Sequence, residues 1–438
     1  MTVRELALLL LDEYELEGKY VNLLLKSHRA DNLTREERAS LTALLYTVTE
    51  HKYTYDYYVC AVAARSLSDI DPRTLNLLRL GVCQIVDMSA IPDFAAVNET
   101  VKLARNKGEA SFVNAILRKI SRLKDEGRLP LPQREKNPAR YLGVVYSFPL
   151  WLTKHFISLL GEEKTEELLR RFNSHDTTDL TVNTLKVGRD ELVAMLGSAG
   201  YDAAPSNISP ITVRISGSVN PAELPGFAEG YFFVQDTASA ISAAVLAPEC
   251  GDKIIDVCAC PGGKSFAAAI LSGDSGRVLS LDIHESKLSL IRDGAERLGL
   301  SSVEVGAQDA RDAIPELVGT FDRVICDCPC SGLGVLGKKS DMRYRDPEGI
   351  RDLPELQCSI LSSASEYLRV GGYMVYSTCT LNPAENEEVV SRFLAEHPNF
   401  ATVPFSIGEM KCEGGMLTLY PHIHNTDGFF VAKLIKLA

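Results

Sequence analysis

From Gly251 to the C-terminus, short apolar runs alternate with segments of helical spacing, and this pattern constrains the fold more than any other feature. The predicted strands are 253–257, 278–282, 303–306, 321–327 and 373–377, and the predicted helices between them are 264–271, 285–298 and 353–367. Strands joined through helices lie parallel in one sheet with helices on its faces. The runs 416–420 and 428–434 predict an antiparallel pair at the sheet edge. The pattern therefore indicates a doubly wound α/β domain.

Aspartates occur at or just after the ends of the first four predicted strands, namely Asp256, Asp282, Asp309 and Asp327. Open α/β sheets bind their ligands outside the carboxyl ends of the strands, so these carboxylates mark the predicted site. Four like charges repel a phosphate group but favour a cationic nucleoside such as S-adenosylmethionine. Asp282 is positioned to accept hydrogen bonds from both hydroxyls of a ribose.

The segment between the first strand and the first helix of this domain is predicted to bind a ligand through its backbone. Its glycines allow a ligand close to the main chain, and the helix N-terminus offers free N–H groups. The predicted cofactor residues here are Cys258, Ala259, Cys260, Pro261, Gly262, Gly263 and Lys264. A Walker A loop would need glycine where Cys258 stands, and the G-x-G-x-x-G dinucleotide fingerprint is absent, so both nucleotide alternatives are disfavoured.

Two thiols follow the fourth and fifth strands. Cys330 lies in Asp327-Cys328-Pro329-Cys330-Ser331-Gly332, and Cys379 ends the fifth strand. These strands are neighbours in many sheets of this type, so Cys330 and Cys379 can face one another. A thiolate that adds to C6 of cytosine makes C5 nucleophilic toward a sulfonium methyl group, and a second thiol can assist release. The alternative is that such thiols are small apolar residues of a turn or core.

The part before Gly251 has a different pattern. Residues 2–128 show helical spacing, with a capping box at Thr34 and Glu37 and a helix start at Asp71-Pro72. Residues 127–138 indicate a linker and 147–172 a helical segment. A strand, a helix and a strand at 180–185, 190–200 and 211–215 then predict a small α+β unit. The expected domains are 1–130 (helical), 131–175 (linker and connector), 176–235 (α+β) and 236–438 (α/β).

Charge is unevenly distributed along the chain, which has a net charge of −12. Residues 1–140 sum to +2 and residues 141–438 to −14, and 102–140 contains eleven basic and four acidic residues. This basic stripe predicts contacts to nucleic-acid phosphates, and a solvated helix face is the alternative. Four basic residues after the Cys330 loop are also predicted to hold RNA phosphates, again with a solvated loop as the alternative: Lys338, Lys339, Arg343 and Arg345.

The eleven cysteines are odd in number, and seven lie between Cys258 and Cys379 inclusive, which is a poor disulfide framework. The early apolar run 6–11 is short and is followed at once by acidic residues, unlike a signal peptide. No later run is long enough to span a bilayer. We therefore expect a cytoplasmic protein with reduced thiols and no membrane partner.

Several motifs together resemble a known family. The segment 256–264, the Cys330 motif, and Ser377-Thr378-Cys379-Thr380 with Asn382-Pro383-x-Glu385-Asn386-Glu387 resemble ribosomal RNA cytosine-5 methyltransferases of the two-cysteine class. Residues 96–105 and 111–120 resemble the last helices of a NusB-like RNA-binding domain. Over its whole length the chain is similar to the bacterial 16S ribosomal RNA cytosine-5 methyltransferases.

This resemblance implies an all-helical NusB-like domain, a small ferredoxin- or RRM-like α+β subdomain, and a Rossmann-like class I methyltransferase domain with a mostly parallel seven-stranded sheet. It implies that Cys379 is the nucleophile, that Cys330 helps to release the product, and that Asp327 contacts both cofactor and base. The implied cofactor is S-adenosyl-L-methionine without a metal. The implied partner is 16S ribosomal RNA, free or in early small-subunit assembly, and the implied state is a monomer. Two alternatives remain open: methylation of transfer RNA, and an RNA-binding protein with an inactive methyltransferase domain.

Cys260 and Cys328 depart from the family pattern, which generally has alanine at both positions. The extra thiols raise a metal-binding alternative, although C-x-C is not the spacing of common zinc folds. The favoured interpretation is that both are alanine-sized core residues, with some sensitivity to oxidation. The run Asn382-Pro383-Ala384-Glu385 predicts an N-cap, a proline at N1 and a glutamate that closes a capping box.

Overall fold

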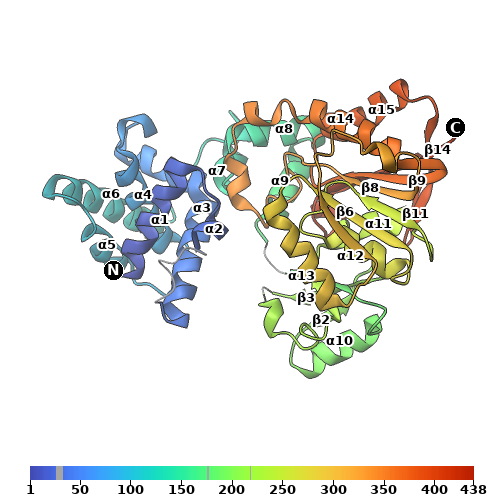
Figure 1. Ribbon diagram of the computed structural model, residues 1–438. Coiled ribbons are helices and arrows are strands. Elements are labelled where there is room, and N and C mark those ends of the chain that lie inside the picture. The colour runs from blue at the N-terminus through green and yellow to red at the C-terminus, as the bar shows by residue number, and fades with distance from the viewer. Residues whose placement is uncertain (26–32, 175–176, 218) are drawn as a thin grey trace. The chain divides into compact units, whose positions relative to one another are not determined.

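The computed structural model describes residues 1–25, 33–174, 177–217 and 219–438. They form two compact units (Figure 1). The first is Met1–Asn173 together with Lys339–Arg345, and the second is Ser174–Lys338 together with Asp346–Ala438. The expected boundary between 175 and 176 lies outside the described residues. No helix in these described ranges is both long and apolar enough to cross a membrane.

The first unit is helical, as predicted. Its helices are α1 (Val3–Glu17), α2 (Val21–Leu25), α3 (Arg35–Ala63), α4 (Pro72–Val86), α5 (Asp93–Val101), α6 (Lys107–Asp125), α7 (Pro138–Tyr146), α8 (Leu150–Leu160) and α9 (Glu162–Phe172). Both predicted helix starts are confirmed. Thr34 and Glu37 form a reciprocal capping box, and the Asp71 side chain accepts from the Thr74 N–H. Helices α1, α3, α5 and α6 pack around α4, which is therefore buried over most of its length.

The unit also contains a segment from far along the chain. Residues Lys339–Arg345, which include the short 3₁₀ helix η6 (Ser340–Tyr344), pack with the helices of the first unit. The Tyr344 hydroxyl donates to the Glu50 carbonyl on α3 at 3.2 Å. A segment that follows the Cys330 loop in sequence is therefore part of the helical core.

The second unit begins with a small antiparallel sheet of order β2-β3-β1-β4. Its elements are β1 (Thr177–Val182), α10 (Arg189–Ser198), β2 (Ala203–Pro205), β3 (Thr212–Ser216) and β4 (Phe232–Val234). The predicted strand, helix and strand are present. The sequence pattern did not identify β2 and β4 because each is three residues long, too short to show alternation.

The larger sheet has the order β10-β14-β9-β8-β5-β6-β7, with β13 paired to β14. Its strands are β5 (Lys253–Asp256), β6 (Arg277–Asp282), β7 (Val303–Ala307), β8 (Phe321–Asp327), β9 (Leu368–Thr378), β10 (Phe400–Thr402), β13 (Met416–Leu419) and β14 (Phe429–Lys436). Strands β5 to β9 pair parallel with one another, whereas β14 pairs antiparallel with β9, β10 and β13. A separate hairpin joins β11 (Phe405–Ile407) and β12 (Met410–Cys412).

Two predictions about this sheet are wrong in detail. The sheet has eight strands rather than seven. The β13–β14 pair forms as predicted, but β14 lies between β9 and β10 instead of at the edge. Its first four residues, Phe429–Ala432, are all buried, which is typical of an interior strand covered on both faces.

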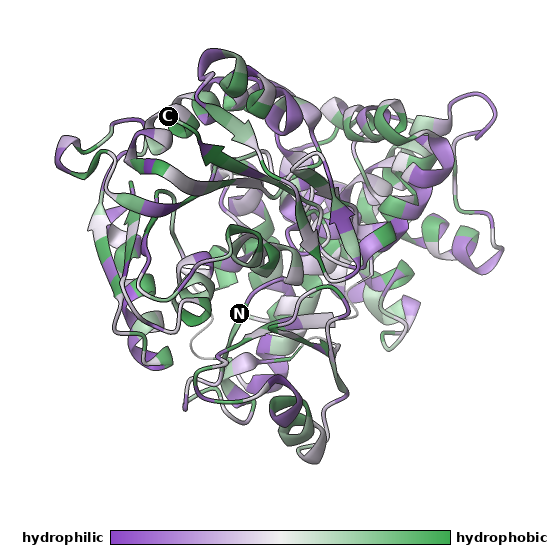
Figure 2. Ribbon diagram, turned by 90° about the vertical axis from the view of Figure 1, so that its right-hand side faces the viewer, coloured by the Kyte–Doolittle hydropathy of each residue, from purple (hydrophilic) through white to green (hydrophobic). Residues whose placement is uncertain are grey.

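Helices cover both faces of the sheet. Helices α11 (Thr237–Leu246), α12 (Gly263–Leu271) and α13 (Leu288–Leu298) share one hydrophobic core with alternate strand residues, and α14 (Leu353–Tyr367) and α15 (Glu387–Glu396) share the other. On β8, Ile325 packs into the first core and Val324 and Cys326 into the second, as strand alternation requires. Figure 1 shows α14 and α15 along one side of the sheet, and Figure 2 shows hydrophobic colouring along the C-terminal strand.

Candidate active site

The carboxyl ends of the parallel strands meet along one edge of the sheet. Asp256 pairs in register with Ile325 on β8, and Asp327 with Ser377 on β9. Strands β8 and β9 are neighbours, as predicted, and this brings the Cys330 and Cys379 Sγ atoms to 3.3 Å from each other. Both side chains are half-buried. The residues that follow β8 and β9 thus create a pair of adjacent thiols that are 49 residues apart in sequence.

Main-chain contacts fix the loop that carries Cys330 against the end of β9. The Gly334 N–H donates to the Cys379 carbonyl at 3.0 Å, and the Gly428 N–H donates to the Gly334 carbonyl at 2.8 Å. A Cβ atom on Gly334 would lie 2.0 Å from the Gly428 carbonyl oxygen, so this close approach requires glycine. The loop therefore has little freedom to move Cys330 away from Cys379.

A partly buried ion pair joins Lys264 of α12 to Asp327 at the end of β8. The Lys264 Nζ is 2.5 Å from Asp327 Oδ2, and the Ser377 hydroxyl donates to Asp327 Oδ1 at 2.7 Å. Burial alone would lower the pKa of Lys264, but the charge and the hydrogen bond of Asp327 raise it, so the ammonium stays charged. Electrostatic attraction from Cys379 raises the same pKa, which indicates that the cation is close to that thiol.

The predicted cofactor loop, 258–264, forms a tight turn between β5 and α12. The Cys260 N–H donates to Asp282 Oδ2 at 3.1 Å, and the His284 N–H donates to the other oxygen at 2.9 Å. Gly262 has a φ of +110°, and a Cβ there would lie 2.4 Å from the Phe266 ring. The loop thus exposes backbone next to the Asp282 carboxylate, as a nucleoside site requires.

The carboxylates of this edge fit a cationic ligand. Asp256 accepts from the Ser265 hydroxyl at 2.8 Å, while its other oxygen is buried with no hydrogen bond to any described residue. Burial raises the pKa of Asp256 to about 7, and a nearby cation would favour its charged form. Asp309 differs, because hydrogen bonds from Arg311 lower its pKa to about 2. Asp256, Asp282 and Asp327 together suit the positive charge of S-adenosylmethionine.

Of the four basic residues predicted to hold RNA phosphates after the Cys330 loop, the structure excludes Arg343. Arg343 is fully buried in the helical unit, where its guanidinium stacks 4.1 Å above the Phe148 ring. The Arg345 guanidinium donates to the Tyr20 hydroxyl. In the second unit, Lys338 Nζ lies 2.5 Å from Asp236 and 2.9 Å from Asp427. The buried Arg343 cannot reach a phosphate, whereas Lys338 and Arg345, which are not buried, already have intramolecular partners. The prediction of phosphate contacts stays untested for Lys338, Lys339 and Arg345.

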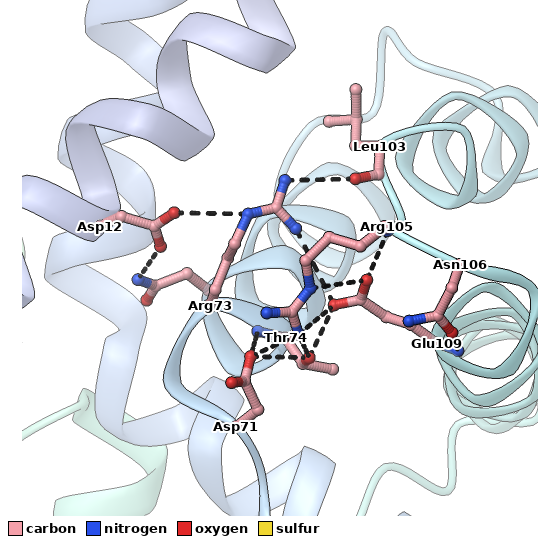
Figure 3. A network of polar contacts seen from close by, with 9 residues as sticks. Asp12, Asp71, Arg73, Thr74, Leu103, Arg105, Asn106 and Glu109 are labelled. Carbon is pink, nitrogen blue, oxygen red and sulfur yellow. Dashed lines mark hydrogen bonds and ion pairs between the residues drawn. The ribbon is translucent and has the colours of Figure 1, made fainter.

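Part of the basic stripe is also neutralised within the helical unit (Figure 3). Arg105 pairs with Asp71 at 2.7 Å and with Glu109 at 3.0 Å. Lys124 pairs with Asp93 in the same way, at 2.8 Å. These ion pairs reduce the positive charge available to RNA, which favours the alternative of a solvated face for those positions.

The two extra thiols occupy different environments. Cys328 is buried in the core beneath α14, with its Sγ 3.5 Å from that of Cys326, so its prediction as a core residue is confirmed. Cys260 is only half-buried, and its Sγ lies 3.7 Å from the Lys287 carbonyl oxygen. Among the described residues, no three Cys, His, Asp or Glu side chains are grouped as metal ligands would be.

The sequence pattern missed the role of Glu385. A capping box would direct its carboxylate to the Asn382 N–H, but that N–H donates to Thr380 Oγ1 instead. The carboxylate accepts from the backbone and the hydroxyl of Ser331, next to Cys330. The only signal in the sequence was the proximity of this glutamate to Cys379, because its partner is 54 residues away.

Comparison with known proteins agrees with this architecture. Residues 1–122 match the profile of the NusB family, 148–221 that of the ferredoxin-like domain of RsmF/B-like methyltransferases, and 243–435 that of "16S rRNA methyltransferase RsmB/F". The chain is similar to the "Probable ribosomal RNA small subunit methyltransferase B" proteins of Synechocystis sp. (34% identity, all of both chains) and Bacillus subtilis (35%, 99% of each). The crystal structure of PH0851 matches with a TM-score of 0.79 and 26% identity over 100% of this chain and 99% of its own.

These matches confirm the predicted fold class in all three parts, and with it the predicted methyl donor. The enzyme is a methyltransferase that uses S-adenosylmethionine. Relatives with at least 34% identity extend over essentially the full chain, so the likeness is not limited to one domain. From its helical N-terminus to its last strand, the chain belongs to the RsmB/F family of 16S ribosomal RNA methyltransferases.

Proposed function

We propose that this enzyme transfers a methyl group to C5 of a specific cytidine in 16S ribosomal RNA, through a covalent bond between Cys379 and C6 of the base. The observation that carries the proposal is the thiol pair at the ends of β8 and β9, with Sγ atoms 3.3 Å apart beside the carboxylate edge. Methylation at a ring nitrogen or a ribose hydroxyl needs no such pair. Methylation at C5 requires at least one nucleophile such as a thiolate, because the ring carbon is unreactive until a nucleophile adds to C6, and a second thiol can assist release.

In the proposed reaction, the Cys379 thiolate adds to C6 and the electron pair of the C5–C6 double bond becomes available at C5. Bound S-adenosylmethionine supplies the electrophilic methyl group. A base then removes the C5 proton, and the C6–S bond breaks with its electron pair returning to Cys379. Lys264 and Asp327, at 2.5 Å from each other, provide a charged pair beside this thiol and on the cofactor side of the base.

Cys330 is proposed to assist the release step. Its hydrogen bond with Cys379 and its burial raise the pKa of Cys330 well above the usual value of 9.0. A raised pKa favours the protonated form of Cys330, so we assign the nucleophilic role to Cys379 and the assisting role to Cys330. Asp327 is the proposed contact between cofactor and base. The target cytidine must leave any base stack to reach this edge.

The same proposal includes the cofactor site, the substrate and the domain limits. We infer that Cys258–Lys264, Asp282, Asp309 and Asp327 bind S-adenosylmethionine, and that the enzyme acts as a cytoplasmic monomer on 16S RNA, free or during early subunit assembly. The domain limits 1–130, 131–175, 176–235 and 236–438 are proposed as working boundaries. The NusB-like domain is the proposed source of additional RNA contacts.

The test is to map methylated cytidines by bisulfite sequencing in a strain that lacks the gene. We expect one 16S position to lose its modification, and to regain it with the intact gene but not with Cys379→Ala. The purified enzyme should methylate the same position in a 16S transcript or an early assembly intermediate. Loss of a mark in transfer RNA instead would establish the alternative substrate, and unchanged RNA in both would contradict the proposal.

A further inference from the structure

Glu385 is a buried carboxylate for which the reaction described above has no role. It ends the 3₁₀ helix η8 (Pro383–Glu385), six residues after Cys379, and its side chain is 0% exposed. Burying a carboxylate that has no hydrogen-bond partners costs free energy. The hydrogen-bond partners of Glu385 therefore indicate which part of the site its carboxylate stabilises.

The carboxylate accepts four hydrogen bonds. Oε2 accepts from the Ser331 N–H at 2.8 Å and from Gln357 Nε2 at 3.0 Å. Oε1 accepts from the Ser331 hydroxyl at 2.5 Å and from Asn382 Nδ2 at 3.0 Å. The same Gln357 Nε2 also donates to the Pro329 carbonyl at 3.0 Å. Glu385 thus holds the backbone on both sides of Cys330, directly through Ser331 and by way of Gln357 through Pro329.

The next residue, Asn386, contacts the other thiol's neighbours in the same manner. Its Oδ1 accepts from the Thr378 hydroxyl at 2.6 Å, and its Nδ2 donates to the Thr380 carbonyl at 3.0 Å. Thr378 and Thr380 flank Cys379. The two halves are joined, because the Ser331 and Thr380 hydroxyls are 2.7 Å apart. The consecutive residues Glu385 and Asn386 therefore contact the neighbours of Cys330 and of Cys379, respectively.

We propose that Glu385 is a positioning residue that holds Cys330 for the release step, and that Asn386 does the same for Cys379 in the addition step. This inference rests on the proposed function. It extends that function by assigning separate steps to two neighbouring side chains that contact neither cofactor nor base. A purely structural role would make both substitutions affect the enzyme in the same way.

The test compares Glu385→Gln with Asn386→Ala. The glutamine keeps the shape but loses acceptors for Ser331 or Gln357, so Cys330 should be displaced. A displacement of about 1 Å costs roughly a hundredfold in rate, so we expect kcat to fall by about that factor with the KM for S-adenosylmethionine unchanged. Glu385→Gln should accumulate a covalent protein–RNA adduct on denaturing gels, as we also expect of Cys330→Ala. Asn386→Ala should form the adduct slowly and accumulate none.

Glu387→Gln is the matched control. It changes the same residue type two positions away, but the Glu387 carboxylate accepts from Thr418 on β13, and within the described part of the chain no hydrogen bond joins this carboxylate to either cysteine loop. We expect turnover and adduct levels like those of the unmodified enzyme. Combining Glu385→Gln with Cys330→Ala should add nothing to Cys330→Ala alone, because both remove the same step.

Two outcomes separate failure of this inference from failure of the proposed function. If Cys330→Ala accumulates adduct and Glu385→Gln does not, Glu385 has no positioning role. If neither Cys330→Ala nor Cys379→Ala behaves as proposed, the covalent mechanism itself is wrong. Should Glu385→Gln fail to fold, Ser331→Ala removes the hydroxyl contacts with Glu385 and Thr380 but keeps the Ser331 N–H bond to Glu385, and it should still raise the adduct level. A folded Ser331→Ala enzyme with no adduct would overturn the inference.

Discussion

Two pairs of cysteines lie close together in this protein, and their sulfur separations are nearly the same. The Sγ atoms of Cys326 and Cys328 are 3.5 Å apart, and those of Cys330 and Cys379 are 3.3 Å apart. In the first pair Cys326 lies on β8 and Cys328 directly follows the strand, and both are buried among apolar residues. The second pair is half-buried at the ends of two strands, beside Lys264, Asp327 and the Glu385 network.

The comparison teaches that proximity between thiols does not by itself make a reactive site. Residues i and i+2 on a strand always share a face, so the first pair needs no explanation beyond strand geometry. The second pair depends on two parallel strands, a glycine contact and a buried carboxylate that hold residues distant in sequence. Four predictions test this difference, from the largest expected effect to the smallest.

The largest effect is expected for Cys379→Ala. Loss of the nucleophile should reduce methyl transfer by about 10⁴-fold or more, since residues that act as a unit lose nearly all activity together. Cys328→Ala, in the other pair, should keep activity within about threefold, as expected for a substitution away from the reacting groups. Incorporation of a radiolabelled methyl group into 16S RNA measures both. Comparable losses in the two variants would remove the distinction between the pairs.

Cys330→Ala should lower turnover by roughly a hundredfold, in the range of lost acid–base assistance, and should trap enzyme on RNA. The adduct should run as a slower band on a denaturing gel and disappear after ribonuclease digestion. The control is Cys326→Ala, which should show no such band. An equal amount of adduct in both variants would contradict a specific release role for Cys330.

The pH dependence of thiol alkylation should also separate the pairs. The raised pKa of Cys330 leaves little thiolate at pH 7, so its reaction with iodoacetamide should increase about tenfold per pH unit up to and beyond pH 9. Burial raises the pKa of Cys328 too, and it is only 4% exposed, so it should remain unmodified over the same range. Mass spectrometry of tryptic peptides measures both. Modification of Cys330 that levels off near pH 8 would show that its pKa is not raised.

The smallest effect is expected on stability. Cys328→Ala removes one buried sulfur atom and should lower the free energy of unfolding by about 1 kcal/mol, a typical value for a small core truncation. Cys250→Ala, at an exposed position, should change it by less than about 0.5 kcal/mol. Urea unfolding followed by circular dichroism measures the difference. Equal values would indicate that Cys328 contributes no packing.

Local pattern was sufficient for much of the fold. The five parallel strands and the helices between three of their pairs were predicted, and the helix starts at Thr34 and Asp71 form as expected. Strand alternation, capping and glycine placement act over a few residues, so they can be read directly from the sequence. Helices α11 and α15 and the short strands were not identified. The missed strands, such as β2 and β4, have three residues each, too few to show alternation.

The residues of the candidate site were also named from the sequence, because each carboxylate or thiol follows a strand end. Their surroundings were not. The burial of Arg343 against Phe148, the ion pairs of Lys338 and the contact of Glu385 with Ser331 all join residues more than fifty positions apart. A sequence pattern carries no signal for such contacts.

The sequence by itself determined where the strands end, that aspartates follow these ends, and that two thiols lie at the same end of the sheet. Only the tertiary structure decided that these thiols lie 3.3 Å apart, which buried groups hold them, and which cations are already paired. The physical reason is the sequence distance over which each kind of interaction acts. Backbone geometry and periodicity are local, whereas thiol spacing, burial and charge pairing depend on how distant strands and loops pack together.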